Sequence, residues 1–184
     1  MALLDVPFEK FRIRSHDLWK NQWLVLASGD YKAGAFNAMT VAWGSLGVMW
    51  NLPFVQTVVR PTRHTHGFME KYPSFTLCAF PEQFRKSLQI LGTRSGRDGD
   101  KICESGLTPV PSVRVAAPSF KEAELVIECR KIYWDDFNPH HFLDPSIESQ
   151  YPARDYHRFY YGEVVAIRGT AEYADSEKVH DHRD

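Results

Sequence analysis

Arginine and threonine side chains are concentrated in one short stretch, residues 60–65. It reads Arg-Pro-Thr-Arg-His-Thr, directly after an apolar run that ends at Val59 and before a predicted helix. Guanidinium and hydroxyl groups donate hydrogen bonds to phosphate, and the first turn of a helix adds backbone N–H groups without partners. The stretch therefore predicts an anion site, with phosphate as its natural ligand.

A second stretch of the same character lies between Gly92 and Lys101 and reads Gly-Thr-Arg-Ser-Gly-Arg-Asp-Gly-Asp-Lys. Two such loops on a nearly neutral chain indicate a phosphorylated cofactor. Each loop alone has an ordinary explanation: the first as a helix capped by Thr62 or Thr65 with solvated arginines, the second as a flexible polar loop after a helix.

Small and amide side chains follow one another from Asn37 to Gly44, which reads Asn-Ala-Met-Thr-Val-Ala-Trp-Gly. Asn37 and Thr40 can present polar groups to the edge of a planar heteroaromatic ring, and Ala38 lets such a ring approach the backbone. A turn asparagine followed by an ordinary strand explains the same residues.

Other catalytic patterns are missing from the sequence. No glycine-rich dinucleotide fingerprint and no P-loop is present. The spacing of His140, His141, Asp144 and His157 matches no standard metal motif, so we predict no metal site. We also identify no catalytic residue.

Composition bounds the class of protein. The chain has 184 residues, 43% of them hydrophobic, and a formal net charge of -1, which favours one domain over residues 1–184 and excludes a general affinity for nucleic acid or an anionic membrane surface. Cys78, Cys103 and Cys129 lie far apart, so we expect buried, reduced thiols in a cytoplasmic protein. Acidic and basic residues near the start and the lack of 18 consecutive apolar residues predict neither a secretion signal nor a membrane span.

Hydrophobic patterning predicts strands in the first and last thirds of the chain and two short helices between them. The expected strands are Gln22 to Ser28, Phe36 to Met49 interrupted at Gly44 and Gly47, Phe54 to Val59, Glu124 to Trp134 and Glu163 to Tyr173. The expected helices are His66 to Tyr72 and Glu82 to Leu91, with a further turn from Asp100 to Ser105.

Two segments of this pattern, the glycine-interrupted strand and residues 138–157, lead to further predictions. The glycines within the second strand predict a bulge or a close approach of the backbone to a ligand. The segment from Asn138 to His157 has no clean period, and we expect a long loop packed on the surface. The order of elements favours an α+β protein with an antiparallel barrel.

Taken in order, four motifs resemble the flavin reductase-like family, including flavoredoxin. They are the run from Asn37 to Gly44, the strand end Val59-Arg60-Pro61-Thr62-Arg63-His64-Thr65, a Phe-x-Leu pattern after a short helix, and the Gly92 to Lys101 loop. The late segment His157-Arg158-Phe159-Tyr160-Tyr161-Gly162-Glu163-Val164 also resembles the closing strand of that family. The resemblance covers nearly the whole chain.

The resemblance implies a mainly β (α+β) fold, a six-stranded antiparallel Greek-key split β-barrel with flanking short helices. It also implies a homodimer with FMN near the subunit interface. Carried over by position, the isoalloxazine ring would lie against Asn37, Met39, Thr40, Ala42 and Trp43. The phosphate and ribityl chain would be held by Arg60, Arg63, Thr65, Ser95, Gly96 and Lys101, with His157 and Tyr160 near the open side of the flavin or the interface.

The implied activity is an NAD(P)H:flavin oxidoreductase, in which transiently bound NADH or NADPH passes hydride to the flavin N5. A flavoredoxin-type electron-transfer protein, with protein donor and acceptor, is the alternative. A cofactor-free barrel that serves as an interaction module is a third class. No protein general base is required for the first two, which agrees with the lack of a catalytic pair.

His66 and Gly67 depart from the family pattern, which often has an acidic residue soon after the threonine. The departure leaves His64 and His66 beside the predicted phosphate site. Bound phosphate should raise the pKa of a nearby histidine, so we predict that FMN affinity depends on pH near neutrality.

Overall fold

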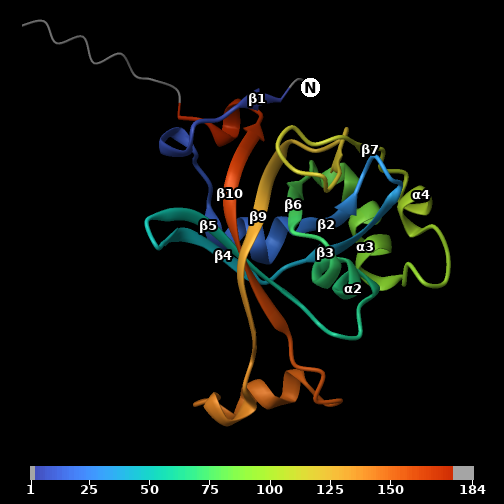
Figure 1. The fold of residues 1–184 in the computed structure, drawn as a ribbon, viewed down its shortest axis with the longest axis vertical. Coiled ribbons are helices and arrows are strands. Elements are labelled where there is room, and N and C mark those ends of the chain that lie inside the picture. Colours follow the sequence, from blue (N-terminus) through green and yellow to red (C-terminus); the bar gives the residue numbers. More distant parts are fainter. Residues whose placement is uncertain (1–2, 176–184) are drawn as a thin grey trace, which may run out of the picture.

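An antiparallel sheet of eight strands runs through residues 3–175, which are the residues that the computed structural model describes (Figure 1). The strand order is β3-β2-β6-β9-β10-β5-β4, and β1 adds to β10. The strands are β1 (Leu4–Asp5), β2 (Leu24–Asp30), β3 (Ala35–Val41), β4 (Gly44–Met49), β5 (Leu52–Val59), β6 (Ser74–Ala79), β9 (Leu125–Asp136) and β10 (Arg158–Gly169), with β7 (Pro109–Val110) and β8 (Ser119–Phe120) as a separate pair.

The sheet does not close on itself, since β3 and β4 stand at its two ends. A mainly β fold with an open barrel and flanking short helices is confirmed. The described residues form eight strands in this sheet where the resemblance implies six, because β1 adds a two-residue ladder, Leu4↔Gly169 and Asp5↔Arg168, and the segment 36–49 divides into two strands at Ala42 and Trp43.

Short helices connect the strands, and those within residues 64–105 lie beside β2 and β3, at one end of the sheet (Figure 1). The α-helices are α1 (Ser15–Asp17), α2 (His64–Lys71), α3 (Arg85–Thr93) and α4 (Lys101–Ser105), and η2 (Leu18–Gln22) is a π-helix. The 3-10 segments are η1 (Phe8–Lys10), η3 (Glu82–Phe84), η4 (Pro139–His141), η5 (Pro145–Gln150) and η6 (Ala171–Tyr173). Both predicted helices are confirmed, with shifted boundaries.

Strand β2 is buried on both faces, which explains its continuous apolar sequence. Leu24 and Leu26 belong to one hydrophobic cluster of the described residues, whereas Val25 and Ala27 belong to another that includes Leu88 of α3. The sheet therefore has a core on each side at this strand, and helix α3 covers one of them.

Segment 138–157 is not a loop packed on the surface, as its sequence led us to expect. The long strands β9 and β10 pair over their full length and carry it away from the barrel as an arm (Figure 1). Turns η4 and η5 lie at its end, and contacts among Phe142, Tyr151 and Tyr156 hold it together. The twelve residues of each strand and the aromatic cluster explain why the segment stands apart.

Strand β10 begins and ends at other residues than predicted. It begins at Arg158 and ends at Gly169, and residues Ala171–Tyr173 form a 3-10 turn instead of continuing the strand. The chain turns there because the N–H of Thr170 donates to the carbonyl of Glu124 and the N–H of Tyr173 donates to the carbonyl of Thr170.

Gly44 is explained by packing within the chain. A Cβ at this position would lie 2.4 Å from Cη2 of Trp19 and 2.4 Å from the carbonyl oxygen of Gln56. The close approach predicted for a ligand is thus made by the protein's own indole ring.

The cysteines are free thiols, but only two of them are buried as expected. Burial raises the pKa of Cys78 to about 12 and that of Cys129 well above its ordinary value. Cys103 is exposed, because it lies on the outer side of the short helix α4. Within residues 3–175 no helix is both long and apolar enough to cross a membrane.

Candidate functional site

The edge strand β3 supplies the first part of the site. Its alternating side chains put Asn37 and Met39 on the face toward α2, while Thr40 faces α3. The side-chain amide of Asn37 donates to Oγ1 of Thr65 over 2.9 Å, and the hydroxyl of Thr40 donates to the carbonyl of Leu88 over 2.5 Å. Both polar groups therefore fix β3 against the neighbouring helices.

The turn between β5 and α2 supplies the second part. Arg63 occupies the N-cap position of α2 in an extended conformation, and no side chain caps the helix. Neither Thr62 nor Thr65 caps the helix, so the threonine cap that would explain this turn without a ligand is absent. The backbone N–H groups of the first turn remain available to an anion.

The loop after α3 lies against this turn. The guanidinium of Arg63 donates to the carbonyl of Gly92 over 2.8 Å, and that of Arg97 donates to the carbonyl of Thr62 over 3.0 Å. A Cβ at Gly96 would lie 2.7 Å from Oδ1 of Asn37, so only glycine lets the loop close here without displacing its neighbours. The structure brings the two arginine-rich loops of the sequence together.

Lys101 is the buried cation of the site, with 4% of its surface exposed. Its ammonium group donates to the carbonyls of Leu91 over 2.9 Å and Arg94 over 3.3 Å. Burial, and then the nearby Arg63, lower its pKa to about 8. Carbonyl groups solvate the ammonium without neutralising it, so its charge favours a bound anion.

A cavity of about 470 Å³ lies where these parts meet, and we call it the cationic cavity. Among residues 3–175, five cationic side chains and one carboxylate line it, together with Met39, Thr65 and Ser95. The charged residues are Arg60, Arg63, Arg94, Arg97, Lys101 and Asp155. This excess of positive charge fits a phosphate group.

Arg60 forms an ion pair with Asp155, the one carboxylate that lines the cavity among the described residues. Its guanidinium donates to Asp155 over 2.7 Å and to the carbonyl of Gln150 over 2.7 Å, and it lies 5.0 Å from the ring centroid of Tyr151. The hydrogen bond from Arg60 lowers the pKa of the Asp155 carboxyl group. The arm segment is therefore tied to the rim of the cavity through Arg60.

A smaller cavity of about 200 Å³ adjoins the first and shares Met39, Arg60 and Arg63 with it. We call it the ring cavity. Its remaining walls come from the end of β3 and the link to β4, from β5, and from the residue that precedes β10: Thr40, Val41, Ala42, Trp43, Val58 and His157.

His157 and Trp43 face each other in the ring cavity, with ring centroids 5.1 Å apart. Nδ1 of His157 lies 2.9 Å from the hydroxyl of Tyr151. Burial, and then Arg60, lower the pKa of His157 to about 4, so the imidazole is neutral at pH 7. Trp43 remains 45% exposed at the mouth of this cavity.

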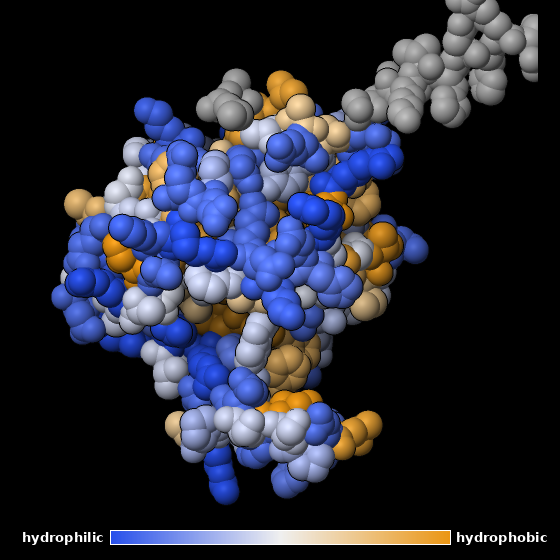
Figure 2. All heavy atoms as spheres, turned by 180° about the vertical axis from the view of Figure 1, so that it is seen from behind, coloured by the Kyte–Doolittle hydropathy of each residue, from blue (hydrophilic) through white to orange (hydrophobic). Residues whose placement is uncertain are grey.

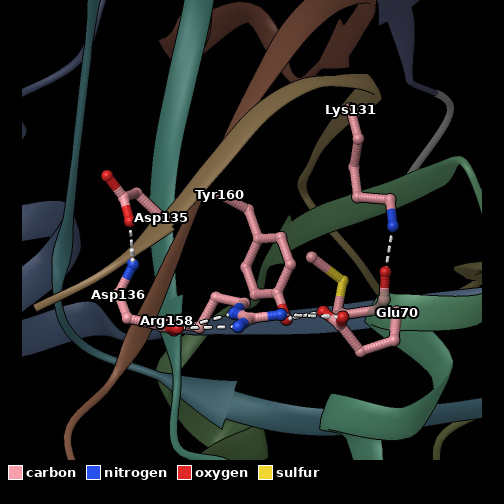
Figure 3. Close-up of polar contacts among 7 residues, drawn as sticks. Glu70, Lys131, Asp135, Asp136, Arg158 and Tyr160 are labelled. Carbon is pink, nitrogen blue, oxygen red and sulfur yellow. Dashed lines mark hydrogen bonds and ion pairs between the residues drawn. The ribbon is translucent and has the colours of Figure 1, made fainter.

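Tyr160 lies apart from both cavities, in a cluster at the other end of α2. Its hydroxyl donates to Glu70 over 2.6 Å, and Arg158 donates to Glu70 over 2.8 Å and to both oxygens of Asp136 over 2.7 Å (Figure 3). We call Glu70, Asp136, Arg158 and Tyr160 the Glu70 cluster. It fixes α2 to the base of the arm.

Most of the site residues predicted from sequence are therefore neighbours in space. Asn37 of β3 and Gly96 of the loop after α3 line a separate cavity of about 680 Å³, to which Lys101 also contributes. His64 lines the cationic cavity, whereas His66 does not. Arg97 belonged to the predicted loop without being singled out, and no local pattern marked Asp155.

Comparison with known proteins identifies the family of the chain and its fold. A family model described as the flavin reductase like domain matches residues 20–183. An uncharacterised protein of Pyrococcus abyssi is 33% identical over 105 residues, which are 56% of this chain and 59% of that protein. The match thus spans less than two thirds of this relative's length.

Solved structures share the fold. An FMN-binding domain of a flavin reductases-like enzyme from Shewanella baltica has a TM-score of 0.67 at 16% identity, over 95% of this chain and 85% of the other. The flavoredoxin of Methanosarcina acetivorans has a TM-score of 0.63 at 20% identity, over 92% of this chain and 74% of the other.

Proposed function

The chain belongs to the flavin reductase-like domain family, and on this basis we propose that it binds FMN and passes hydride from NADH or NADPH to the flavin. Bound FMN would supply the hydride-accepting N5 atom, which no side chain can replace. The residues of the chain bind and orient the two partners.

The cationic cavity supports the proposal through its charge. Arg63, Ser95 and Lys101 converge on a space that fits a phosphate group, and Arg60 lines the same space although it is paired with Asp155. The uncapped end of α2 adds N–H donors. The burial of Lys101 is the observation that carries the assignment. A buried ammonium group that bonds only to carbonyls raises the free energy of the folded protein, and a bound anion would lower it.

The ring cavity suits the flat end of the same ligand. β3 is an edge strand within residues 3–175, so no described strand pairs with its outer N–H and C=O groups, and they can bond the polar edge of a heteroaromatic ring. Met39, Ala42 and Trp43 supply apolar walls. In this arrangement Asn37, Thr40 and Thr65 position β3 and α2, since their side chains bond to the protein.

A neutral His157 suits the ring cavity as well. It packs on Trp43 and leaves the charge of the site to the phosphate end. The exposed indole of Trp43 leaves one side of the cavity open, where nicotinamide can reach the ring.

We further propose that the protein is a homodimer. Large apolar side chains are exposed on the β4–β5 hairpin, on β9 and on the arm: Val48, Met49, Trp50, Tyr133, Trp134, Leu143 and Ile147. Apolar surface is also visible where the arm joins the body (Figure 2). A second copy would cover this surface. Light scattering with Val48→Asp, which should dissociate the dimer, tests this.

The test of function is the visible spectrum of the purified, FMN-loaded protein under anaerobic NADH or NADPH. Bleaching within seconds supports the reductase. A flavin spectrum that persists until dithionite is added supports an electron-transfer role. The fold shared with flavoredoxin and the exposed side chain of Trp43 favour this second role. A protein that does not bind FMN contradicts both and leaves a cofactor-free interaction module.

A further inference from the structure

A groove of about 410 Å³ lies along the outer face of α2, and the site described so far does not use it. It shares Arg63, His64 and Arg97 with the cationic cavity, so the two spaces meet at these side chains. A ligand whose phosphate lies in the cationic cavity can therefore continue into the groove.

Aromatic rings line the groove at successive turns of the helix. His64 and Phe68 are in edge contact with centroids 5.3 Å apart, and Phe68 and Tyr72 are stacked with centroids 6.1 Å apart and 13° between their planes. The ammonium of Lys71 lies 5.2 Å from the ring centroid of Tyr72. Half-buried rings beside cations are suited to a nucleotide base and its phosphate.

Gly67 lines this groove, and no neighbour among the described residues requires glycine at this position. It lies inside the eight-residue helix α2, where glycine is less favourable than alanine. A Cβ there would meet no atom within 4 Å, and its φ is not in the left-handed region. The missing side chain has one clear consequence, which is to leave the groove open.

We propose that this groove binds the adenylate half of a flavin dinucleotide, so that the protein prefers FAD to FMN. The inference rests on the proposed flavin site. The pyrophosphate would lie between Arg63 and Arg97, and the adenine would lie on Phe68 and Tyr72 beside Gly67. Continuity with the cationic cavity favours a ligand covalently joined to the flavin phosphate over a separate nucleotide.

Titration of the flavin-free protein with FMN and with FAD tests the proposal, followed by tryptophan fluorescence or calorimetry. We expect FAD to bind about five- to 100-fold more tightly, the range of one base stacked on an aromatic side chain. Gly67→Leu fills the groove with a good helix former, and it should reduce FAD affinity to that of FMN while FMN affinity stays within twofold.

Lys86→Ala is the matched surface control for Lys71→Ala, since Lys86 is exposed on α3. The Lys71 variant should weaken FAD alone, and the Lys86 variant should change neither flavin. Thermal unfolding of each variant verifies that the fold is retained.

Equal affinity for FAD and FMN, or an FAD preference unaffected by Gly67→Leu, overturns the inference while leaving the flavin site intact. The inference is also overturned if Gly67→Leu raises the KM for NADH or NADPH without changing the affinity for FAD, because the groove then binds the nicotinamide nucleotide. Failure to bind either flavin overturns the proposed function itself.

Discussion

Helix α2 carries a polar cluster at each end, and the two differ in how their charges are balanced. At the C-terminal end, Arg158 is held between the carboxylates of Glu70 and Asp136 (Figure 3). At the N-terminal end, Arg63 and Lys101 bond to backbone carbonyls instead. Cations paired with carboxylates stabilise a fold, whereas cations without them favour an anionic ligand.

The comparison also separates residues that sequence motifs group together. Tyr160 and His157 belong to one motif, yet His157 lines the ring cavity and Tyr160 belongs to the Glu70 cluster. Mutations at the two ends of α2 should therefore have opposite signatures: loss of flavin affinity at one end, loss of stability at the other.

The largest effect is expected for Lys101→Met. Loss of the buried ammonium should weaken FMN binding roughly 10- to 100-fold, since a charge-assisted hydrogen bond contributes about 1.5 to 3 kcal/mol. The free energy of unfolding without flavin should not fall, because the substitution removes an uncompensated buried charge. Fluorescence titration and urea unfolding measure the two quantities, with exposed Lys86→Met as the control. Unchanged FMN affinity would contradict the assignment.

Deprotonation of Lys101 at high pH should reproduce, without mutation, part of the loss of FMN affinity expected for Lys101→Met. Its pKa is lowered to about 8 from an ordinary value of 10.5, so the unfolded chain holds the proton over this interval and the folded chain does not. The unfolding free energy of the flavin-free protein should then rise with pH across this interval, and FMN affinity should fall as the ammonium is lost. Both slopes should vanish in Lys101→Met, and a variant that keeps them would assign them to another group.

Glu70→Ala tests the opposite end of α2. Tyr160 loses its acceptor and Arg158 loses one of its two carboxylates, so the unfolding free energy should fall by about 1 to 2 kcal/mol, discounted for partial exposure. FMN affinity should stay within twofold. Arg14→Ala removes a well-exposed ion pair, with an arginine side chain 89% exposed, and should cost less. A tenfold loss of FMN affinity in the Glu70 variant would show that the clusters are not independent.

A smaller loss of stability is expected for Tyr160→Phe. It removes one hydrogen bond to Glu70 and retains the buried ring, which costs about 0.5 to 1.5 kcal/mol of unfolding free energy. FMN affinity should not change, although the resemblance to the family places Tyr160 near the flavin. Urea unfolding and an FMN titration decide between the two roles.

The smallest effect is expected at His64. Burial, and then Arg97 and Lys101, lower the pKa of this imidazole in the flavin-free protein. Bound phosphate would raise it, so FMN affinity should increase as pH falls from roughly 8 to 6. The slope should be lost in His64→Gln and kept in His66→Gln, since His66 does not line the cationic cavity. A flat profile in the unmodified protein would sink the hypothesis.

Much of the fold could be predicted from sequence because its signals are local. Apolar runs mark β2 and β5, and Pro81 precedes the helical segment that contains α3, although this helix continues through Gly92 to Thr93. The arm could not be predicted, since its position depends on the pairing of β9 with β10 and on aromatic contacts within the segment. The change from strand to 3-10 turn after Gly169 likewise depends on the bond between Thr170 and Glu124.

The sequence by itself determined where anion-binding groups occur: the turn 60–65 and the loop 92–101 carry them in their own residue types. Only the tertiary structure decided which cations remain available. Asp155 reaches Arg60 across 95 positions, Glu70 reaches Arg158 across 88, and packing buries Lys101 beside carbonyls alone. Charge compensation depends on distances between residues far apart in the chain, and these distances are fixed only when the sheet and the helices pack.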